Sequence, residues 1–245
     1  MSAQPIVSAR GLTVRFGGLV AVNDVSFNIK AGEIIGLIGP NGAGKTTLFS
    51  MLVGLHKPTS GEIEFEGRRI DRKRPHVIAR QGMTKTFQNT ALFPEMSLLE
   101  NVTTAALLRH PLAQAREIAM DCLEKVGLAR EAETDVDDLT FPQKALGEVA
   151  RALATGPKVL LLDEVMAALT PPEMDTVIAT LRGLRDREGL TLIVVEHHMR
   201  AIMRLSERLL VLNFGRLIAD GAPAEVSANP DVIAAYLGGS HAQHV

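Results

Sequence analysis

The sequence predicts an α/β fold with a parallel sheet at its core, an antiparallel β part and a separate helical part. Short apolar runs at residues 34–38, 159–162 and 192–195 are typical of strands that are buried on both faces. Stretches of helical periodicity separate these runs, and such alternation indicates a parallel sheet covered by helices on both sides. From about residue 97 to 156 the periodicity is helical throughout, which predicts the helical part.

The N-terminal part is expected to form antiparallel β-strands. Residues 11–30 alternate between apolar and polar side chains around Gly17 and Gly18, which supply a turn. The alternating apolar residues are Leu12, Val14 and Phe16 before the turn, and Val25, Phe27 and Ile29 after it. The segment 62–66 alternates in the same way and ends at Gly67, so it predicts a further antiparallel strand.

The remaining elements follow from apolar stripes and turn residues. The run at 34–38 leads through a glycine-rich loop into a helical stretch with Leu48, Met51, Leu52 and Leu55. The stripes of the helical part are Ala115, Ile118, Ala119, Cys122 and Val126, and Leu146, Val149, Ala150 and Leu153. Pro171 and Pro172 open a helix ahead of the run at 192–195. Residues 209–219 predict a hairpin, with short helices that end near Gly238.

We expect a single domain over residues 1–245. Its α/β core, with the β part, takes residues 1–88 and 157–245, and its helical part takes residues 89–156. The chain has 245 residues, of which 46% are hydrophobic and 22% charged. This composition excludes a disordered chain, a collagen-like rod and a long coiled coil.

Charge and cysteine content limit the partners and the compartment. The net charge is −2, which gives no overall attraction to nucleic acid. Cys122 is the single cysteine and cannot form an internal disulfide, and the first residues lack the apolar core of a secretory signal. The apolar runs are far shorter than the roughly 20 residues that span a bilayer. We therefore expect a cytosolic chain that serves a membrane, if at all, from the side.

The strongest functional signal is the segment 39–46, which fits the pattern G-x-x-x-x-G-K-[ST] between a predicted strand and a predicted helix. Its glycines let main-chain N–H groups turn toward phosphate oxygens, and the helix N-terminus adds partial positive charge. Lys45 would reach the β and γ phosphates, and Thr46 would ligate Mg²⁺. The alternative is a glycine-rich turn without a ligand. The predicted phosphate-binding residues are Gly39, Pro40, Asn41, Gly42, Ala43, Gly44, Lys45, Thr46 and Thr47.

A nucleotide site also needs a carboxylate for the metal and a group that activates water. Asp163 and Glu164 follow the apolar run at 159–162 and supply both at the end of a predicted strand. We expect Asp163 to hold Mg²⁺, directly or through water, and Glu164 to act as general base or to orient the water. Taken alone, such a pair is more often an N-terminal helix cap. Together with the phosphate-binding pattern, the metal and base roles are favoured.

Two histidines follow a third predicted strand end, at 197 and 198. His197 would face the γ-phosphate if its strand lies beside the strand of the phosphate loop, and its neutral ring could donate to a phosphate oxygen. Without the other motifs, adjacent histidines on a loop are usually surface residues. Gln88 follows the strand-like residues 85–87 and is a weaker candidate, since alone it would be taken for an exposed loop residue.

The order of these motifs resembles the ATP-binding cassette (ABC) family over essentially the whole chain. The segments that look like the ATPase subunits of branched-chain amino acid importers are 16–27, 86–89, 92–96 and 234–238. The resemblance implies a P-loop NTPase fold of ABC type with a RecA-like parallel core. It also implies that Phe16 stacks on adenine, that Gln88 senses the membrane partner and joins the metal site, and that His197 is the switch histidine.

The same resemblance implies ATP and Mg²⁺ as cofactors and ATP hydrolysis that powers solute import, with branched-chain or other amino acids as the favoured cargo. The implied partners are a second ABC ATPase subunit in a homodimer or heterodimer, integral permease subunits and, indirectly, a solute-binding protein. No nucleic acid is expected. The implied location is peripheral, at the cytoplasmic face of the inner membrane.

The chain departs from the family just before the helix that leads to Asp163. Family members carry L-S-G-G-Q or a close variant there, which binds the γ-phosphate held by the partner subunit. Here this signature segment is Leu139, Thr140, Phe141, Pro142 and Gln143. Thr140 keeps a hydroxyl, but Pro142 has no N–H to donate. The segment also has capping-box spacing from Thr140 to Gln143, with a proline that suits a first helical turn. Both interpretations can hold together.

A second departure lies at residues 165–171, where Thr170 replaces an acidic or amide side chain that crosses the dimer interface in the family. We expect an asymmetric dimer in which the ATP of this chain meets an intact signature segment of its partner, while the partner's ATP meets the altered one. In a homodimer both sites would be altered. That case favours a nucleotide-gated regulatory subunit with little hydrolysis.

Two further features favour ordinary structural roles. The basic stretch 68–74 lacks interleaved aromatic residues and follows a ribbon turn, so a solvated face is favoured over a nucleic-acid surface, with lipid headgroups as an alternative partner. Cys122 lies on the apolar stripe of its predicted helix, which favours packing over reactivity.

Overall fold

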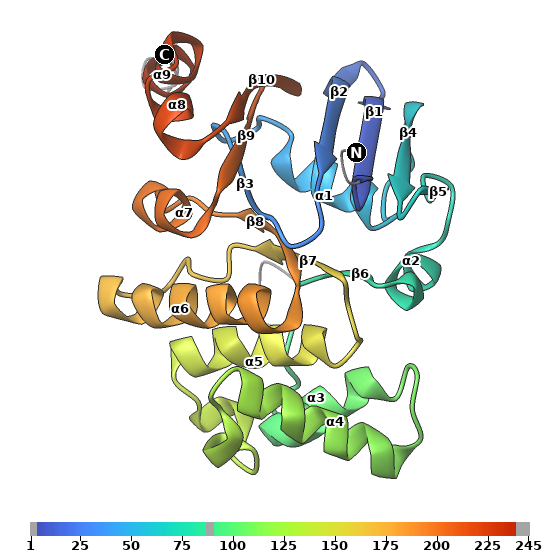
Figure 1. Ribbon diagram of the computed structural model, residues 1–245, viewed down its shortest axis with the longest axis vertical. Helices are drawn as coiled ribbons and strands as arrows, with labels where there is room; N and C mark the ends of the chain where they lie inside the picture. The colour runs from blue at the N-terminus through green and yellow to red at the C-terminus, as the bar shows by residue number, and fades with distance from the viewer. Residues whose placement is uncertain (1–3, 87–90, 239–245) are drawn as a thin grey trace.

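A six-stranded sheet forms the centre of the protein, as the computed structural model of residues 4–86 and 91–238 shows (Figure 1). The strands follow the order β10-β9-β3-β8-β7-β6. Their bounds are β3 Ile34–Ile38, β6 Met83–Lys85, β7 Val159–Asp163, β8 Thr191–Val195, β9 Arg208–Asn213 and β10 Arg216–Gly221. All neighbours pair in parallel except the β9–β10 hairpin. The predicted α/β fold is confirmed.

A separate antiparallel sheet is built from the N-terminal part. Its order is β2-β1-β4-β5, with β1 Val7–Phe16, β2 Leu19–Ile29, β4 Ser60–Phe65 and β5 Arg68–Arg69. Gly17 adopts the left-handed φ of 58° that the tight turn between β1 and β2 requires. The alternating residues Leu12 and Val14 are buried, whereas Phe16 at the strand end is 45% exposed. The antiparallel strands predicted over residues 11–30 are therefore confirmed, and Phe16 is available for contact with a ligand.

Helices flank both sheets. Their bounds are α1 Lys45–Leu52, α2 Pro75–Gln81, α3 Leu98–Ala106, α4 Leu112–Lys125, α5 Phe141–Leu153, α6 Pro171–Glu188, α7 Met199–Leu205, α8 Pro223–Ser227 and α9 Pro230–Gly238, with short 3₁₀ turns at Ala129–Glu131 and Val136–Asp138. The prediction that the first helical stretch includes Leu55 is wrong. Gly54 takes a left-handed φ of 75°, the helix ends at Leu52, and Leu55 is half exposed.

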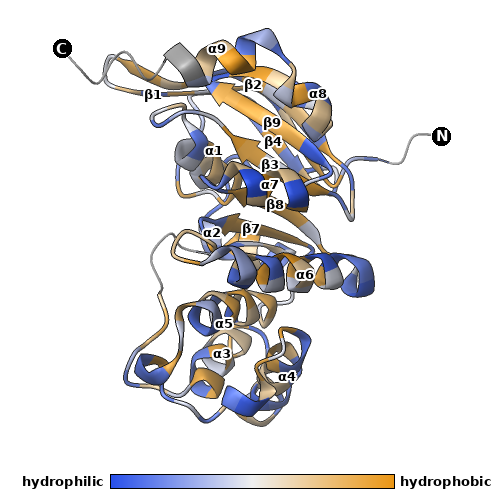
Figure 2. Cartoon of the chain, turned by 90° about the vertical axis from the view of Figure 1, so that its left-hand side faces the viewer, coloured by the Kyte–Doolittle hydropathy of each residue, from blue (hydrophilic) through white to orange (hydrophobic). Residues whose placement is uncertain are grey.

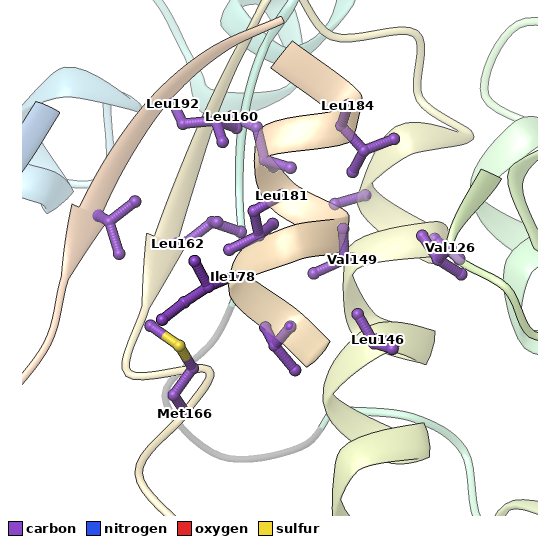
Figure 3. Close-up of a cluster of buried hydrophobic side chains, with 14 of the residues drawn as sticks. Val126, Leu146, Val149, Leu160, Leu162, Met166, Ile178, Leu181, Leu184 and Leu192 are labelled. Atoms are coloured by element: carbon purple, nitrogen blue, oxygen red, sulfur yellow. The ribbon is translucent and has the colours of Figure 1, made fainter. Parts of the chain in front are cut away.

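Alternate residues of the central strands belong to two different apolar clusters. Leu160 and Leu162 of β7 pack into one cluster and Leu161 into the other. Because strand side chains alternate between faces, both faces of the sheet are covered, as the uninterrupted apolar runs predict. One face meets α6, whose Ile178 and Leu181 lie beside β7 (Figure 3), and the other face meets α1 and the antiparallel sheet. Figure 2 shows the hydrophobic character of these central strands.

Helices α3, α4 and α5 pack against one another on the side of α6 that faces away from the central sheet (Figures 1 and 2). Of the predicted stripe on α4, Ala115, Ala119 and Cys122 are buried and Ile118 is half-buried. This grouping supports the proposed helical part at residues 89–156, within which the three helices fall. In the described residues, none of the helices combines the length and the apolar character that crossing a bilayer demands.

Candidate functional site

The loop between β3 and α1 needs glycine for steric reasons at two points. A Cβ at Gly39, which has φ 151°, would come within 2.1 Å of the Leu212 carbonyl oxygen. A Cβ at Gly44, which has φ 101°, would come within 2.5 Å of the Ala21 carbonyl oxygen. Gly44 is also the N-cap of α1. These glycines let the main chain curl tightly ahead of the helix N-terminus, where main-chain N–H groups favour anions.

Lys45 is folded into this loop. Its side chain is 6% exposed, and Nζ donates to the Gly39 carbonyl oxygen at 2.7 Å and to the Pro40 carbonyl oxygen at 3.0 Å. Burial lowers the pKa of Lys45, while the negative charges of Glu164 and Asp163 act in the opposite direction. The ammonium group is thus held by neutral carbonyl groups next to the acidic pair. A phosphate oxygen is the kind of partner that such a cation lacks.

Several predicted residues of the loop and helix start remain accessible. Asn41, Gly42 and Thr46 are exposed and Thr47 is half-buried, all at the first turn of α1 or just before it. The loop is braced from behind by the β9–β10 turn, where the Gly215 N–H donates to the Ala43 carbonyl oxygen at 3.0 Å. The side facing the helix N-terminus is therefore open while the opposite side is fixed.

Asp163 ends β7 and is almost fully buried, with 1% exposed. Its Oδ2 accepts from Lys85 Nζ at 3.1 Å, and its main-chain N–H donates to the Thr86 hydroxyl at 3.1 Å. Its Oδ1 is buried and has no hydrogen-bond partner among residues 4–86 and 91–238. A buried carboxylate oxygen without a partner is costly, and a hard cation would satisfy it. The site therefore fits Mg²⁺.

Glu164 and His197 meet across two strand ends. Oε1 of Glu164 lies 2.6 Å from Nε2 of His197, and the Glu164 N–H donates to the Val195 carbonyl oxygen at 2.9 Å. Glu164 has a left-handed φ of 55°, which is unusual for a residue with a side chain. The prediction for His197 requires its strand to lie beside the strand that leads into the phosphate loop. This requirement is met, because β8 pairs in parallel with β3 at Val195 and Leu37.

The alternative role of the acidic pair as a helix cap is wrong. Helix α6 begins at Pro171, and its N-cap is Thr170. Glu173 Oε2 accepts from the Thr170 N–H and from its hydroxyl, each at 2.7 Å. Asp163 and Glu164 thus do not cap α6, and Thr170, at a position that crosses the dimer interface in the family, has a local capping role.

Sequence reasoning missed two residues that contact Asp163 and a third, Glu196, that contacts the segment after Glu164. Lys85 and Thr86 contact Asp163 from the neighbouring strand end. Glu196 is 2% exposed, and its Oε1 accepts from the Met166 N–H at 2.8 Å. Burial raises the pKa of Glu196 to about 7, with smaller contributions from the charges of Glu164 and Asp163. The sequence signal for Glu196 was a carboxylate directly after an apolar strand. It was missed because attention went to the two histidines that follow it.

Phe16 lies within the described residues, whereas Gln88 does not. Phe16 lies at the end of β1, and its ring meets the His56 ring edge to face, with 5.3 Å between centroids. Its exposure leaves room for a stacked base. Gln88 falls outside the described residues, so its expected metal and sensing roles stay predictions.

The signature segment forms the start of α5. The Thr140 N–H and hydroxyl both donate to Gln143 Oε1 at 2.9 Å, and Pro142 lies in the first turn of the helix. The capping role is therefore confirmed. Leu139 is buried, whereas Phe141 is 69% exposed.

The two remaining features agree with structural roles. Arg68, Arg72 and Arg74 are exposed, and Arg69 pairs with Asp71 at 3.1 Å, as a solvated face requires. Cys122 is buried on α4, and burial raises its pKa to about 12, which leaves the thiol uncharged and unreactive.

Comparison with known proteins agrees with this geometry. Residues 22–167 match the family model described as ABC transporter, and residues 216–242 match the model described as branched-chain amino acid ATP-binding cassette transporter. The chain is 40% identical over 252 residues to the high-affinity branched-chain amino acid transport ATP-binding protein BraF of Pseudomonas aeruginosa, covering 96% of this chain and 99% of that protein. It is 38% identical to LivG of Escherichia coli K12, a protein with the same description, at the same coverage.

Solved structures give the same result. The ADP conformation of MJ1267, an ATP-binding cassette of an ABC transporter, superposes with a TM-score of 0.88 at 27% identity, covering 96% of this chain and 100% of that chain. A dimeric post-hydrolysis state of the cassette MJ0796 bound to ADP and Pi gives 0.78 at 26% identity, covering 89% and 98%. Since a family model matches more than half of the chain and the relatives match nearly all of it, the chain belongs to the ABC transporter family as an ATP-binding cassette ATPase.

Proposed function

We propose that this chain is the ATP-hydrolysing subunit of an importer for branched-chain or other amino acids. The observation that carries the proposal is the group formed by Lys45, Asp163, Glu164 and His197 at neighbouring strand ends. The printed functions of BraF and LivG support the cargo, as does the match of residues 216–242 to the branched-chain amino acid model.

Residues 39–47 bind the ATP phosphates in this proposal. Main-chain N–H groups at the start of α1 surround the oxygens, and Lys45 turns from its carbonyl partners to the phosphates. Phe16 stacks on the adenine. Mg²⁺ is held by Asp163 and Thr46, with Gln88 as the predicted third group, and when bound it neutralises charge on the phosphates.

Glu164 orients or deprotonates the attacking water. Its Oε1 is paired with His197, which fixes the orientation of the carboxylate beside the strand that leads into the phosphate loop. The neutral ring of His197 has a single N–H, which faces Glu164; in this proposal a γ-phosphate oxygen shares it when ATP is bound, since the strand of His197 adjoins the loop strand. Hydrolysis thus depends on the contact between two strand ends, whereas nucleotide binding depends on the loop.

A second cassette would complete the site. We propose that the signature segment at 139–143 faces the nucleotide of a partner ATPase subunit. We also propose that the two ATPase subunits bind permease subunits at the cytoplasmic face of the inner membrane, and that the conformational change driven by ATP is passed to these permease subunits. A solute-binding protein delivers the cargo to that permease. No nucleic acid takes part. Dimeric cassettes among the similar structures support this arrangement.

One observation favours a second function, that of a nucleotide-gated regulatory subunit with little hydrolysis. Pro142 removes one N–H from the segment that would contact the partner's γ-phosphate, and the segment is occupied with its own helix cap. This alternative applies if the chain forms homodimers, since every site would then lack that donor.

The test is ATP hydrolysis by the complete transporter in proteoliposomes, with its permease subunits and binding protein. Leucine, isoleucine or valine on the binding protein is expected to raise hydrolysis above the basal rate. Glu164→Gln in this chain removes that increase, and Glu66→Gln, on an exposed turn, serves as the control. Hydrolysis that ignores the amino acid refutes the cargo, and hydrolysis that survives Glu164→Gln refutes the proposed site.

A further inference from the structure

The segment after β7 is hydrogen-bonded at three points to the end of β8 and to the side chains that follow it. The Glu164 N–H donates to the Val195 carbonyl oxygen, and the Met166 N–H donates to Glu196 Oε1. Further along, His198 Nε2 lies 3.3 Å from the Ala167 carbonyl oxygen. The segment that carries Glu164 is therefore held in place by the end of β8 rather than by its own helix.

Glu196 is a costly residue for a merely structural role. Its side chain is 2% exposed, and one carboxylate oxygen, Oε2, has no hydrogen-bond partner in the described part of the chain. Burial of an incompletely paired carboxylate disfavours folding, and an apolar side chain of similar size would avoid that penalty. The bond that Glu196 does make, at 2.8 Å to the Met166 N–H, is buried.

Met166 is the anchor of this segment. Its side chain is fully buried in the apolar cluster under α6, and Figure 3 shows it beside β7 and Ile178. Its carbonyl oxygen accepts from the Leu169 N–H at 3.2 Å, while the Glu164 carbonyl oxygen accepts from the Ala167 N–H at 3.3 Å. The turns 164–167 and 166–169 thus overlap at Met166 and join Glu164 to Leu169, just ahead of α6.

We propose that Glu196 is a positioning residue for ATP hydrolysis, which holds the Met166 N–H so that Glu164 keeps the strained backbone in which its Oε1 meets His197. The inference rests on the proposed role of Glu164 toward water. Glu164 has a left-handed φ of 55°, a conformation that persists only where neighbouring contacts impose it. Loss of the Met166 contact releases Glu164 to relax away from His197.

The expected effect is on turnover and not on nucleotide binding. Misplacement of a reacting group by about 1 Å costs on the order of 100-fold in rate. We therefore expect Glu196→Leu to lower kcat by about 10- to 100-fold and to leave the KM for ATP and the affinity for a fluorescent ATP analogue within about threefold of the wild type. No hydrogen bond joins the Glu196 side chain to the phosphate loop in the described residues, and we therefore expect binding to be spared.

The decisive comparison is with Glu196→Gln. Glutamine has nearly the same volume and keeps an Oε1 that accepts from the Met166 N–H, so this variant is expected to retain kcat within about threefold. Thr103→Val is the matched control, because it removes a buried hydroxyl bonded to the Leu99 carbonyl oxygen in α3, far from the phosphate loop in the sequence. Its kcat is expected to be unchanged after correction for the folded fraction.

The outcomes separate this inference from the proposed function. Rates are normalised to the amount of bound ATP analogue, and Glu196→Met replaces Glu196→Leu if the latter does not fold. If Glu196→Leu, or Glu196→Met in its place, has the same kcat as the wild type, the positioning role is overturned. A Glu196→Gln variant that is as slow as Glu196→Leu overturns it as well. Full hydrolysis by Glu164→Gln refutes the proposed function itself, whatever Glu196 variants do.

Discussion

Nε2 of His197 lies 2.6 Å from Oε1 of Glu164, although the two residues are 33 positions apart in the sequence. The contact exists because β7 and β8 are parallel neighbours, with Asp163 opposite Val195, so that the residues after each strand emerge side by side. It also lies next to β3, which leads into the phosphate loop. The sheet order therefore brings Glu164 and His197 together beside the strand that leads into the loop 39–46.

Replacement of His197 by alanine is expected to slow hydrolysis by about 10² to 10³-fold, because the carboxylate of Glu164 loses its partner and the γ-phosphate loses a donor. Nucleotide affinity should change little, since the loop and Lys45 are untouched. Single-turnover hydrolysis with excess enzyme measures this directly. His76→Ala, at an exposed position of α2, is the control, and an equal loss in both variants would argue against a specific role for His197.

The pH dependence of folding should report on Glu196. Burial raises its folded pKa to about 7, above the ordinary glutamate pKa of 4.5, so between these pH values the folded chain keeps a proton that the unfolded chain releases. Stability from this group is fully present below about pH 4.5 and is lost as pH rises through about 7, at most about 3 kcal/mol in all. Urea unfolding at pH 5, 6, 7 and 8 in Mg²⁺-free buffer measures it. The free energy of unfolding of Glu196→Gln should increase relative to that of the wild type as the pH rises along this series. A difference that stays constant with pH would contradict the expectation.

Cys122 should resist thiol reagents in the folded protein. A pKa of about 12 leaves roughly one thiol in 10⁴ ionised at pH 8, and the side chain is 4% exposed. We expect no modification by iodoacetamide in hours under native conditions and complete modification in urea. Mass spectrometry of intact protein distinguishes the two. Rapid native alkylation would show that α4 is not packed as described.

Pro142 offers a test of the altered signature segment. Pro142→Ala restores one main-chain N–H in the first turn of α5 and preserves the cap between Thr140 and Gln143. If the segment contacts the partner's phosphate, turnover at the partner's site should rise by about 10-fold or more. Pro223→Ala, in the first turn of α8, is the matched control. An unchanged rate in Pro142→Ala would mean that the missing donor is not limiting.

Much of the site was predictable because its chemistry is local in the sequence. The glycines and Lys45 lie in one short pattern between a strand and a helix, and Asp163 and Glu164 directly follow an apolar run. The capping pair of Thr140 and Gln143 was equally visible from spacing alone.

What escaped prediction depends on which strands are neighbours. Lys85 touches Asp163 only because β6 pairs with β7, and Glu196 reaches Met166 only because β8 lies on the other side of β7. Neither adjacency is encoded in local periodicity. The end of α1 was misplaced for a different reason, because Leu55 continues the apolar stripe while Gly54 breaks the helix.

The central claim is that the loop ending at Lys45 binds the phosphates of ATP. Isothermal titration of the purified chain with Mg-ATP tests it most directly. We expect a heat of binding that saturates near one nucleotide per chain in the wild type and falls below detection in Lys45→Ala. The same heat in Lys45→Ala as in the wild type, or no heat from the wild type at millimolar nucleotide with its partner subunits present, would contradict the account.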